Sequence, residues 1–266
     1  MPHDTLAHET GFLLPDTVFR TRALIRHNLV LMLREPGPLL SRLLMPLVAV
    51  LVFEPLYRAA MPGDRSAGVG QAVTGMLVLF SLLALSIVGT SILTERSWHT
   101  WDRLRATPLR PAELLVGKAI PVLAMLLAQQ VLVLGFGVVV LGMQVADIRL
   151  LALAVAVWSV TLLCVGTALG TLLRSQAAFS AVQDIGSFVS TSLGGALVPL
   201  GALPGWARHL APASPAYWAM SALRGAVAGE TSQVLRAVLV LLAIAVVAAL
   251  LAGWRINRGW GRSTLL

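Results

Sequence analysis

The amino-acid sequence predicts an all-α polytopic membrane protein. We expect six transmembrane helices, an amphipathic interfacial helix before them, a cytoplasmic helix after the second span and outer re-entrant helices before the sixth. Three observations carry this prediction. Of the 266 residues, 57% are hydrophobic and only 12% are charged, about half the charged fraction of a soluble domain. Uncharged apolar runs long enough to cross a bilayer recur along the chain. The 20 Lys and Arg residues are unevenly divided among the connecting segments.

The first helix, predicted over residues 14–34, is amphipathic. One helical face carries the apolar residues Leu14, Val18, Ile25, Leu29 and Met32. Another face carries Arg20, His27 and Arg34, flanked by Arg22 and Arg26. So many arginines argue against a membrane span, and the pattern favours a helix that lies in the cytoplasmic interface. A soluble leader helix is the alternative interpretation.

Six apolar runs predict membrane spans, because each is long enough to cross the hydrocarbon core and carries few charges. The predicted spans are residues 39–59, 69–93, 113–142, 149–173, 177–200 and 233–253. The boundary between the fourth and the fifth span has the weakest signal. Only Arg174, Ser175 and Gln176 interrupt a long apolar stretch there.

The distribution of cations predicts that both termini are cytoplasmic. With that topology the outside holds Arg58, Arg65, Arg149, Arg208, Arg224 and Arg236, and the other 14 of the 20 cations lie inside. Short cytoplasmic loops are the ones enriched in Lys and Arg. Lys118 is the only lysine, which together with the richness in Ala, Leu and Val indicates a bacterial chain and a bacterial cytoplasmic membrane. Contacts with the lipid bilayer explain the net charge of +8, so we expect no nucleic-acid partner.

The segment before the last span, residues 201–220, interrupts the apolar pattern. Together with the residues just before it, it carries Pro199, Pro204, Trp206 and Pro215. Proline excludes a continuous span here, and aromatic side chains suit the interface of a bilayer. We therefore expect two short helices that dip partway into the outer leaflet, with a plain surface loop as the alternative.

The connector TERSWHTWDRLRATPLR, residues 94–110, is a dense charged and aromatic segment between two apolar runs. Thr94 or Ser97 can cap a short helix and Pro108 ends it, so we expect a helix over residues 95–108. A helix of this length is marginal alone in water and needs something to pack against.

One face of this short helix indicates an interface. Trp98, Trp101 and Arg105 lie at i, i+3 and i+7, and Trp and Arg are the residue types that anchor protein interfaces. A helix that lies on the membrane, with Trp among the headgroups and Arg reaching the phosphates, explains the pattern equally well.

Two motifs resemble the ABC-2 type transporter permeases, and among them most closely the daunorubicin-resistance-type drug exporters. The run E-R-x-x-x-T-x-D-R-L-R-x-T-P-L begins at Glu95, continues to Leu114, Leu115, Gly117 and Lys118, and resembles the family's first cytoplasmic loop. The second motif resembles the family's pattern before the last span and is matched at Gly194, Gly195, Pro199, Leu203, Pro204, Trp206 and Pro215. One departure is His99, which stands where the family often has Gly.

The resemblance implies that residues 95–108 form a coupling helix seated in a cleft of an ATP-binding subunit. The implied docking residues are Glu95, Arg96, Trp98, Trp101, Asp102, Arg103, Leu104, Arg105, Thr107 and Pro108. Two ATP-binding subunits, and either a second copy of this chain or a sister permease, complete the implied assembly. The exporter would move amphipathic small molecules, drug or lipid-like, out across the membrane.

ATP chemistry has to come from the partner. The phosphate-binding pattern G-x-x-x-x-G-K-[ST] does not occur in the sequence. We therefore expect no cofactor bound by this chain, with ATP and Mg in the partner subunit, and a transport subunit rather than an enzyme.

Seven residues are candidates for a substrate pathway or for the seam between two permeases: Met76, Phe80, Asp184, Ser187, Phe188, Thr191 and Gly195. Asp184 is an acidic residue well inside a predicted span, so it should face protein or water. It either serves the pathway or pairs with Arg174 or Gln183. Ser187, Thr191 and Gly195 form a small-residue stripe that allows two helices to approach closely. Met and Phe in membrane helices are more often core residues.

Two other function classes are kept as alternatives. A secondary transporter usually places several ionisable groups near the bilayer midplane. A membrane-embedded lipid-modifying enzyme would need a cluster of catalytic or metal-ligating side chains, but all five His residues fall in predicted loops or in the first helix. We therefore predict no metal site and no catalytic residue.

Overall fold

The computed structural model of the chain describes residues 13–34, 36–61, 65–89, 93, 111–173 and 175–257. Within these ranges every regular element is a helix, which confirms the all-α prediction. The long helices are α1 (Leu13–Arg34), α2 (Pro36–Ala60), α3 (Arg65–Leu83), α6 (Pro111–Val139), α7 (Ile148–Leu172), α8 (Gln176–Leu193) and α11 (Thr231–Asn257). Between α8 and α11 lie η1 (Leu200–Ala202), α9 (Gly205–Leu210), η2 (Ala211–Ala213) and α10 (Pro215–Ala228).

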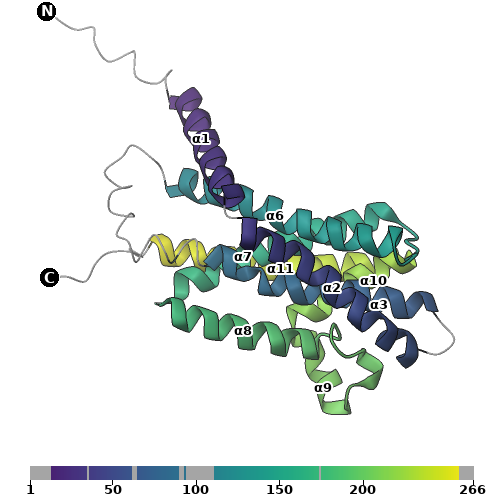
Figure 1. Cartoon of the computed structure of the whole chain (residues 1–266). Helices are drawn as coiled ribbons and strands as arrows, with labels where there is room; N and C mark the ends of the chain where they lie inside the picture. Colours follow the sequence, from purple (N-terminus) through teal and green to yellow (C-terminus); the bar gives the residue numbers. More distant parts are fainter. Residues whose placement is uncertain are drawn as a thin grey trace, which may run out of the picture.

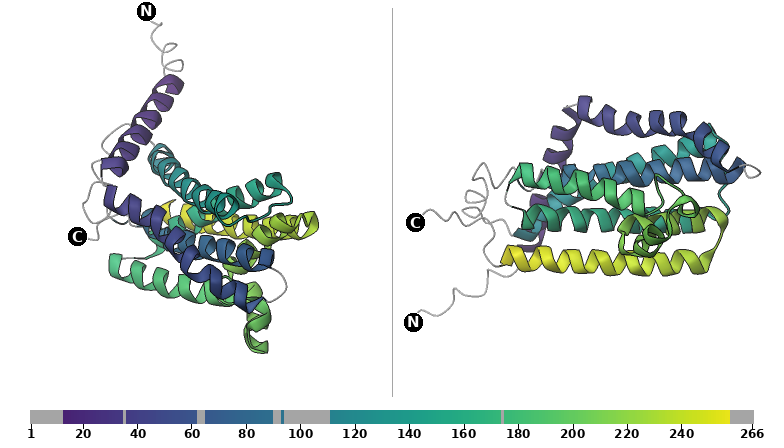
Figure 2. Two further views of the ribbon diagram at one scale, coloured as in Figure 1. Left: turned by 45° about the vertical axis from the view of Figure 1, so that its right-hand side comes forward. Right: turned by 90° about the horizontal axis from the view of Figure 1, so that it is seen from below.

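Five of the described helical segments are long and apolar enough to cross a membrane. They are Gly37–Ala60, Ser66–Gly89, Gly117–Val139, Ile148–Leu172 and Thr231–Arg255. Helix α8 is not among them: its 18 residues are long enough, but they include polar side chains such as Gln183 and Asp184, which lower its mean hydropathy. It nevertheless runs alongside the other helices of the bundle (Figure 2). The predicted count of six spans therefore stays a prediction.

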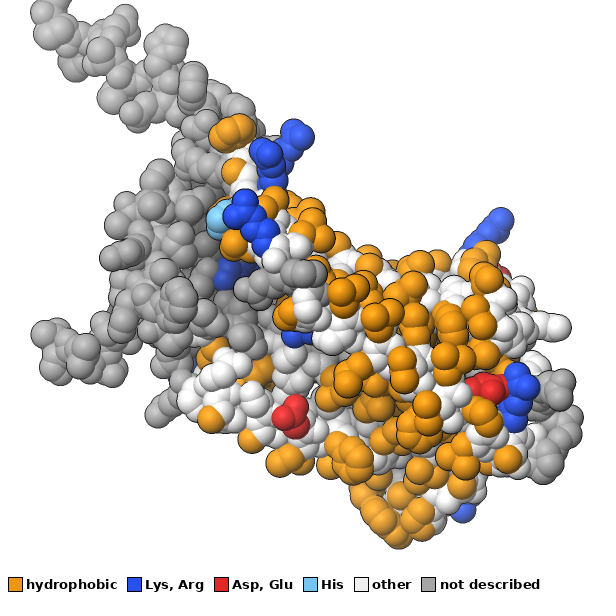
Figure 3. All heavy atoms as spheres, in the orientation of Figure 1, with side chains coloured by type: hydrophobic (Ala, Val, Ile, Leu, Met, Phe, Trp, Pro, Cys, Tyr) orange, Lys and Arg blue, Asp and Glu red, His pale blue; other side chains and the backbone are white. Residues whose placement is uncertain are grey.

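The bundle has two ends, which we name by the elements found there. Helix α1 and the last residues of α11 lie at one end, here called the α1 end (Figure 1). The α6–α7 loop and the start of α11 lie at the other, here called the α9 end because α9 projects from the side of the bundle in that half (Figures 1 and 2). The lateral face seen in Figure 3 is covered largely by hydrophobic side chains, and Lys and Arg side chains gather toward its ends. This distribution is what a bilayer-spanning bundle requires.

The spans differ in how much protein surrounds them. In the Ser66–Gly89 span 72% of the residues are buried, whereas in the Gly37–Ala60 span only 17% are. Helix α3 is therefore a central element, and α2 is peripheral. A buried hydrogen bond ties α3 to α7, in which Trp158 Nε1 donates to Ser81 Oγ at 2.8 Å.

Several boundaries differ from those predicted. The predicted span 177–200 is helical only to Leu193, because a turn follows in which Gly195 has a φ of +79°. The predicted span 113–142 ends as a helix at Val139, before Gly142, whose φ is +69°. The predicted span 69–93 is broken at Ala84 and resumes over residues 85–89.

The predicted outer segment 201–220 is also longer and more deeply packed than two short dipping helices. Helix α9 is short as expected, but α10 continues to Ala228. Its side chains Ala219, Met220 and Leu223 are at most 1% exposed. Apolar side chains spaced three and four residues apart give α10 a continuous face for the bundle interior, which explains why it does not stay at the surface.

Candidate functional site

The predicted coupling helix lies outside the described residues. This holds for all ten predicted docking residues from Glu95 to Pro108, and for His99. The two described residues nearest to it on either side are Leu93 and Pro111, the first residue of α6. The connector thus joins α3, the most buried of the five spans, to α6.

Helix α1 packs against the beginning of α6, directly after this connector. Asn28 Nδ2 donates a hydrogen bond to the Gly117 carbonyl oxygen at 3.3 Å. A Cβ added at Gly117 would lie 2.8 Å from the Cβ of Leu24, so glycine permits the close approach of the two helices. On the other side of α1, Arg26 and His27 are exposed, as the amphipathic pattern predicts.

The seven candidate pathway or seam residues fall into two groups. Met76, Ser187 and Thr191 are at most 3% exposed, and Gly195 is also buried. Phe80 is half-buried, whereas Asp184 is exposed and Phe188 is 64% exposed. The small-residue stripe therefore faces the interior of this chain, and the opposite side of α8 is the surface that a neighbour could cover.

The helix of the Ser66–Gly89 span is interrupted at Ala84, directly after α3, and a side chain of α8 bonds the main-chain oxygen that the interruption leaves free. The Ile87 N–H donates to the Ala84 carbonyl at 3.0 Å, three residues back, instead of to the Leu83 carbonyl. The freed Leu83 oxygen accepts hydrogen bonds from Gln183 Nε2 at 2.9 Å and from Ser86 Oγ at 3.1 Å. A side chain of α8 thus takes the place of a missing helical hydrogen bond in α3.

A second contact joins α8 to residues 85–89, the short helical segment that follows the interruption at Ala84. The Phe179 side chain is fully buried against Gly89, and a Cβ at position 89 would overlap its ring. Gly89 is five residues before the connector segment that begins at Thr94. The helical residues 85–89, which follow α3 and lead toward this connector, are therefore held by α8.

A cavity of about 450 Å³ lies between α3, α7 and α8. Its lining is largely apolar and includes Leu85, Leu169 and Leu193, with Ser187 among them. Within the described part of the chain, Ser187 Oγ has no hydrogen-bond partner. The cavity thus offers a largely apolar space in which the Ser187 hydroxyl is unpaired, whereas the hydroxyls of Ser190 and Ser214, which also line it, bond each other at 2.8 Å.

The turn after α8 is fixed by side chains from three other helices. Tyr57 Oη donates to the Leu197 carbonyl at 2.6 Å, Gln71 Nε2 donates to the Gly195 carbonyl at 2.9 Å, and Arg224 Nη2 donates to the same oxygen at 3.3 Å. The turn also lies directly against Gly75, where a Cβ would overlap the Ala196 carbonyl oxygen. We call this arrangement the carbonyl clamp.

The carbonyl clamp shows that the chain re-enters the bundle after α8. Gly75 lies ten residues beyond Arg65, the first residue of α3, which is about 15 Å along a helix. The turn therefore lies well inside α3's span, and α10 then runs back to the end of the bundle, where the Ala146 N–H donates to the Val227 carbonyl at 3.0 Å.

The family of the chain follows from a comparison with known proteins. The ABC-2 type transporter family model matches residues 20–228, which extends from α1 through α10. The chain belongs to the ABC-2 type transporter family. No curated protein sequence matches this chain.

In this ABC-2 permease the residues of the second motif have structural roles that can be stated. Pro199 and Pro204 precede η1 and α9, and Pro215 is the first residue of α10. Ser214 Oγ caps α10 by accepting from the Ala216 N–H at 3.2 Å. Trp206 is 66% exposed on α9, where a bilayer interface would accommodate its ring.

Four residues organise these sites in the permease, and the sequence singled out only Gln183 among them, as a possible partner of Asp184. The carbonyl clamp is formed by Tyr57, Gln71 and Arg224. Gln183 donates to the Leu83 carbonyl oxygen that the interruption at Ala84 leaves free. The available signal was a glutamine inside an apolar helix, since a buried amide needs hydrogen-bond partners. Among the described residues, no group of three or more His, Cys, Asp or Glu side chains could hold a metal ion.

Proposed function

We propose that this permease is the transmembrane subunit of an ATP-driven exporter that moves amphipathic small molecules, drug or lipid-like, out across a bacterial cytoplasmic membrane. Of the family, the daunorubicin-resistance-type exporters are the closest counterpart in this proposal. Both termini are cytoplasmic, so that the α1 end faces the cytoplasm and the α9 end faces outward.

The observation that carries the proposal is the position of the connector. It joins the most buried span to α6, and α1 packs on α6 just beyond it. A force applied to residues 94–110 would therefore reach the core of the bundle and not a peripheral helix. This is the arrangement expected of a coupling helix that moves with a partner.

The proposed partner is an ATP-binding subunit, present in two copies, that holds ATP and Mg. Glu95, Arg96, Trp98, Trp101, Asp102, Arg103, Leu104, Arg105, Thr107 and Pro108 are the proposed docking residues. Closure of the two ATP-binding subunits would move this segment as a rigid element, and α3 and α6 would transmit the movement.

The second permease, identical or sister, is placed against the exposed side of α8. Asp184 lies in the middle of this helix and is exposed in the single chain. A charged side chain that faces lipid near the bilayer centre costs about 2.5–3.5 kcal/mol on insertion scales. Cover by a second permease, or by a water-filled pathway between the two, removes this cost.

The experiment for the coupling helix is reconstitution of the permease with its ATP-binding subunit in proteoliposomes. Trp101→Ala and Arg103→Ala should abolish the stimulation of ATP hydrolysis and the ATP-dependent transport, and should leave membrane insertion unchanged. Trp206→Ala and Arg26→Ala, which change exposed residues of the same types elsewhere, are the matched controls. Normal transport and normal stimulation in both coupling-helix variants would refute the proposal.

The seam is tested separately by cross-linking. Cys164 is the only cysteine, so Cys164→Ala supplies a background without thiols. In that background Phe188→Cys should form a disulfide-linked dimer under oxidation. Val246→Cys, placed at a residue that is 56% exposed on α11, should stay monomeric. The reverse result would place the seam on α11.

A further inference from the structure

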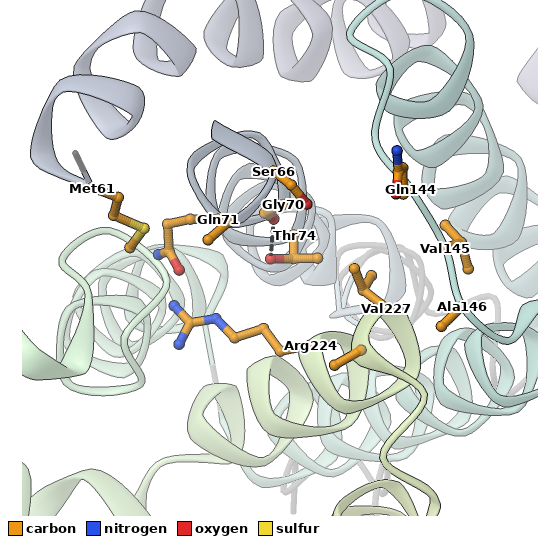
Figure 4. A pocket seen from close by; sticks show the side chains of 12 residues that line it. Met61, Ser66, Gly70, Gln71, Thr74, Gln144, Val145, Ala146, Arg224 and Val227 are labelled. Atoms are coloured by element: carbon orange, nitrogen blue, oxygen red, sulfur yellow. Dashed lines mark hydrogen bonds between the residues drawn. The ribbon is translucent and has the colours of Figure 1, made fainter. Parts of the chain in front are cut away.

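A polar cavity of about 500 Å³ lies at the α9 end, apart from the apolar cavity beside α8 (Figure 4). Four elements enclose it: the end of α2, the beginning of α3, the α6–α7 loop and α10. Its polar lining residues are Ser66, Gln71, Thr74, Gln144 and Arg224. The cavity therefore combines a cation with hydroxyl and amide groups in a bundle whose buried side chains are mostly apolar.

The Arg224 guanidinium is the dominant charge of this cavity. A guanidinium has five N–H donors, and the structure assigns one contact to it, from Nη2 to the Gly195 carbonyl oxygen. The ion pair among the described residues joins Glu54 to Arg58 and does not include Arg224. A partly buried cation without a carboxylate partner favours the binding of an anion.

Gln71 supplies a second, independent indication of a ligand. Its side chain is 2% exposed, and its Nε2 donates to the Gly195 and Ala196 carbonyl oxygens at 2.9 and 3.2 Å. Its Oε1 has no hydrogen-bond partner among the described residues. A buried carbonyl oxygen of this kind is stabilised by a ligand that brings an O–H or N–H donor.

The depth of the cavity indicates what kind of ligand carries both groups. Met61 follows α2, Ser66 begins the span of α3, and Gln144 lies in the loop between α6 and α7. The ends of membrane spans lie at the level of the lipid headgroups. An anion that is abundant at this depth is a phosphate esterified to an amphipathic molecule.

We propose that this cavity binds the phosphate headgroup of an amphipathic molecule, with Arg224 contacting the phosphate oxygens and Gln71 Oε1 accepting a hydrogen bond from a headgroup hydroxyl or ammonium group. The proposal does not depend on the direction of transport or on the ATP-binding partner. It requires only that the α9 end lies at a bilayer surface.

The test measures binding to the purified full-length chain in a neutral detergent. Short-chain phosphatidylglycerol carries both the phosphate and the hydroxyl donors, and phosphatidylcholine of equal chain length carries the phosphate without a donor. Free glycerol phosphate is the third probe, because it distinguishes a soluble phosphate from a lipid-borne one. We expect phosphatidylglycerol to bind at least about tenfold more tightly than phosphatidylcholine, the size expected for a hydrogen-bonded charged group.

Two variants locate the binding. Arg224→Gln should weaken phosphatidylglycerol binding by at least about tenfold. Because this change also removes a contact of the carbonyl clamp, Ala228→Phe provides a second variant that fills the cavity from its exposed edge and leaves the clamp intact. Arg149→Gln and Ala202→Phe, which change exposed residues outside the cavity lining, are the matched controls.

The binding results of the variants and of the three probes distinguish this site from binding elsewhere on the protein. Loss of binding in both cavity variants, with both controls unchanged, supports the site. Competition by free glycerol phosphate then identifies the headgroup alone as the ligand, and its failure to compete shows that the acyl chains are needed. Unchanged binding of phosphatidylglycerol to Ala228→Phe, or equal affinity for phosphatidylcholine in the unmodified chain, overturns the proposal.

Discussion

The side-chain amide of Gln183 donates a hydrogen bond to the main-chain carbonyl of Leu83 at 2.9 Å, across 100 residues of sequence. This bond links the middle of α8 to the one point where α3 is interrupted. Since α3 leads to the predicted coupling helix, the link joins that segment to the helix that carries Asp184.

The first prediction concerns this bond. Gln183→Met keeps the length of the side chain but removes the donor, so that the Leu83 carbonyl retains only the Ser86 hydroxyl. We expect the free energy of unfolding to fall by about 1–2 kcal/mol, measured by thermal unfolding in detergent. Val182→Leu, at an exposed neighbour on α8, should have no effect. Equal stability of the two variants would show that the bond is incidental.

The second prediction concerns the contact of Gly89 with Phe179. Gly89→Ala inserts a methyl group where the buried ring already lies, and overpacking of this kind costs about 1–3 kcal/mol. The double variant Gly89→Ala with Phe179→Ala should lose less stability than the sum of the two single losses, because the added methyl has room once the ring is removed. The control is Gly253→Ala in α11, where nothing lies within 4 Å of an added Cβ. Strictly additive losses in the double variant would argue against direct contact.

The third prediction concerns the close approach within the carbonyl clamp. Gly75→Ala places a methyl group against a main-chain oxygen, which cannot rotate away as a side chain can. We expect the free energy of unfolding to fall by about 1–3 kcal/mol. Gly135→Ala in α6 meets open space, and should stabilise its helix by up to about 1 kcal/mol. A stable Gly75→Ala variant would contradict the packing of the turn against α3.

The fourth prediction concerns topology, and uses the same background without thiols, Cys164→Ala. Arg149→Cys, at an exposed position at the start of α7, should react with a membrane-impermeant maleimide in intact cells. His27→Cys, at an exposed position of α1, should react only after the cells are permeabilised. Labelling of His27→Cys in intact cells would reverse the proposed orientation.

Much of the helix content could be predicted from the sequence, because long apolar runs and prolines are local signals. Helix α1 covers Leu13–Arg34 where residues 14–34 were expected, and its Arg26 and His27 are exposed as predicted. Pro204 and Pro215 stand at the beginnings of helices, where the fixed φ of proline is tolerated.

Other features depend on contacts that the sequence does not reveal. The break in α3 falls at Ala84, in a run without proline or glycine, and its partner is 100 residues away. The small-residue stripe of α8 was recognised, but whether it faces a second chain or the interior is decided by the packing of α3 and α10 against α8. The polar cavity combines Gln71 with Arg224 from distant helices, and neither residue was singled out.

The carbonyl clamp also determines how the bundle can deform. Because side chains of α2, α3 and α10 hold the same turn, these helices and the end of α8 are tied together around it, whereas the helical hydrogen bonding of the Ser66–Gly89 span is interrupted at Ala84. From Ala84 to the start of α3 is about 28 Å along the helix. A tilt of about 10° at that point would displace the opposite end of α3 by roughly 5 Å, so a small rotation at one membrane surface is amplified into an opening at the other.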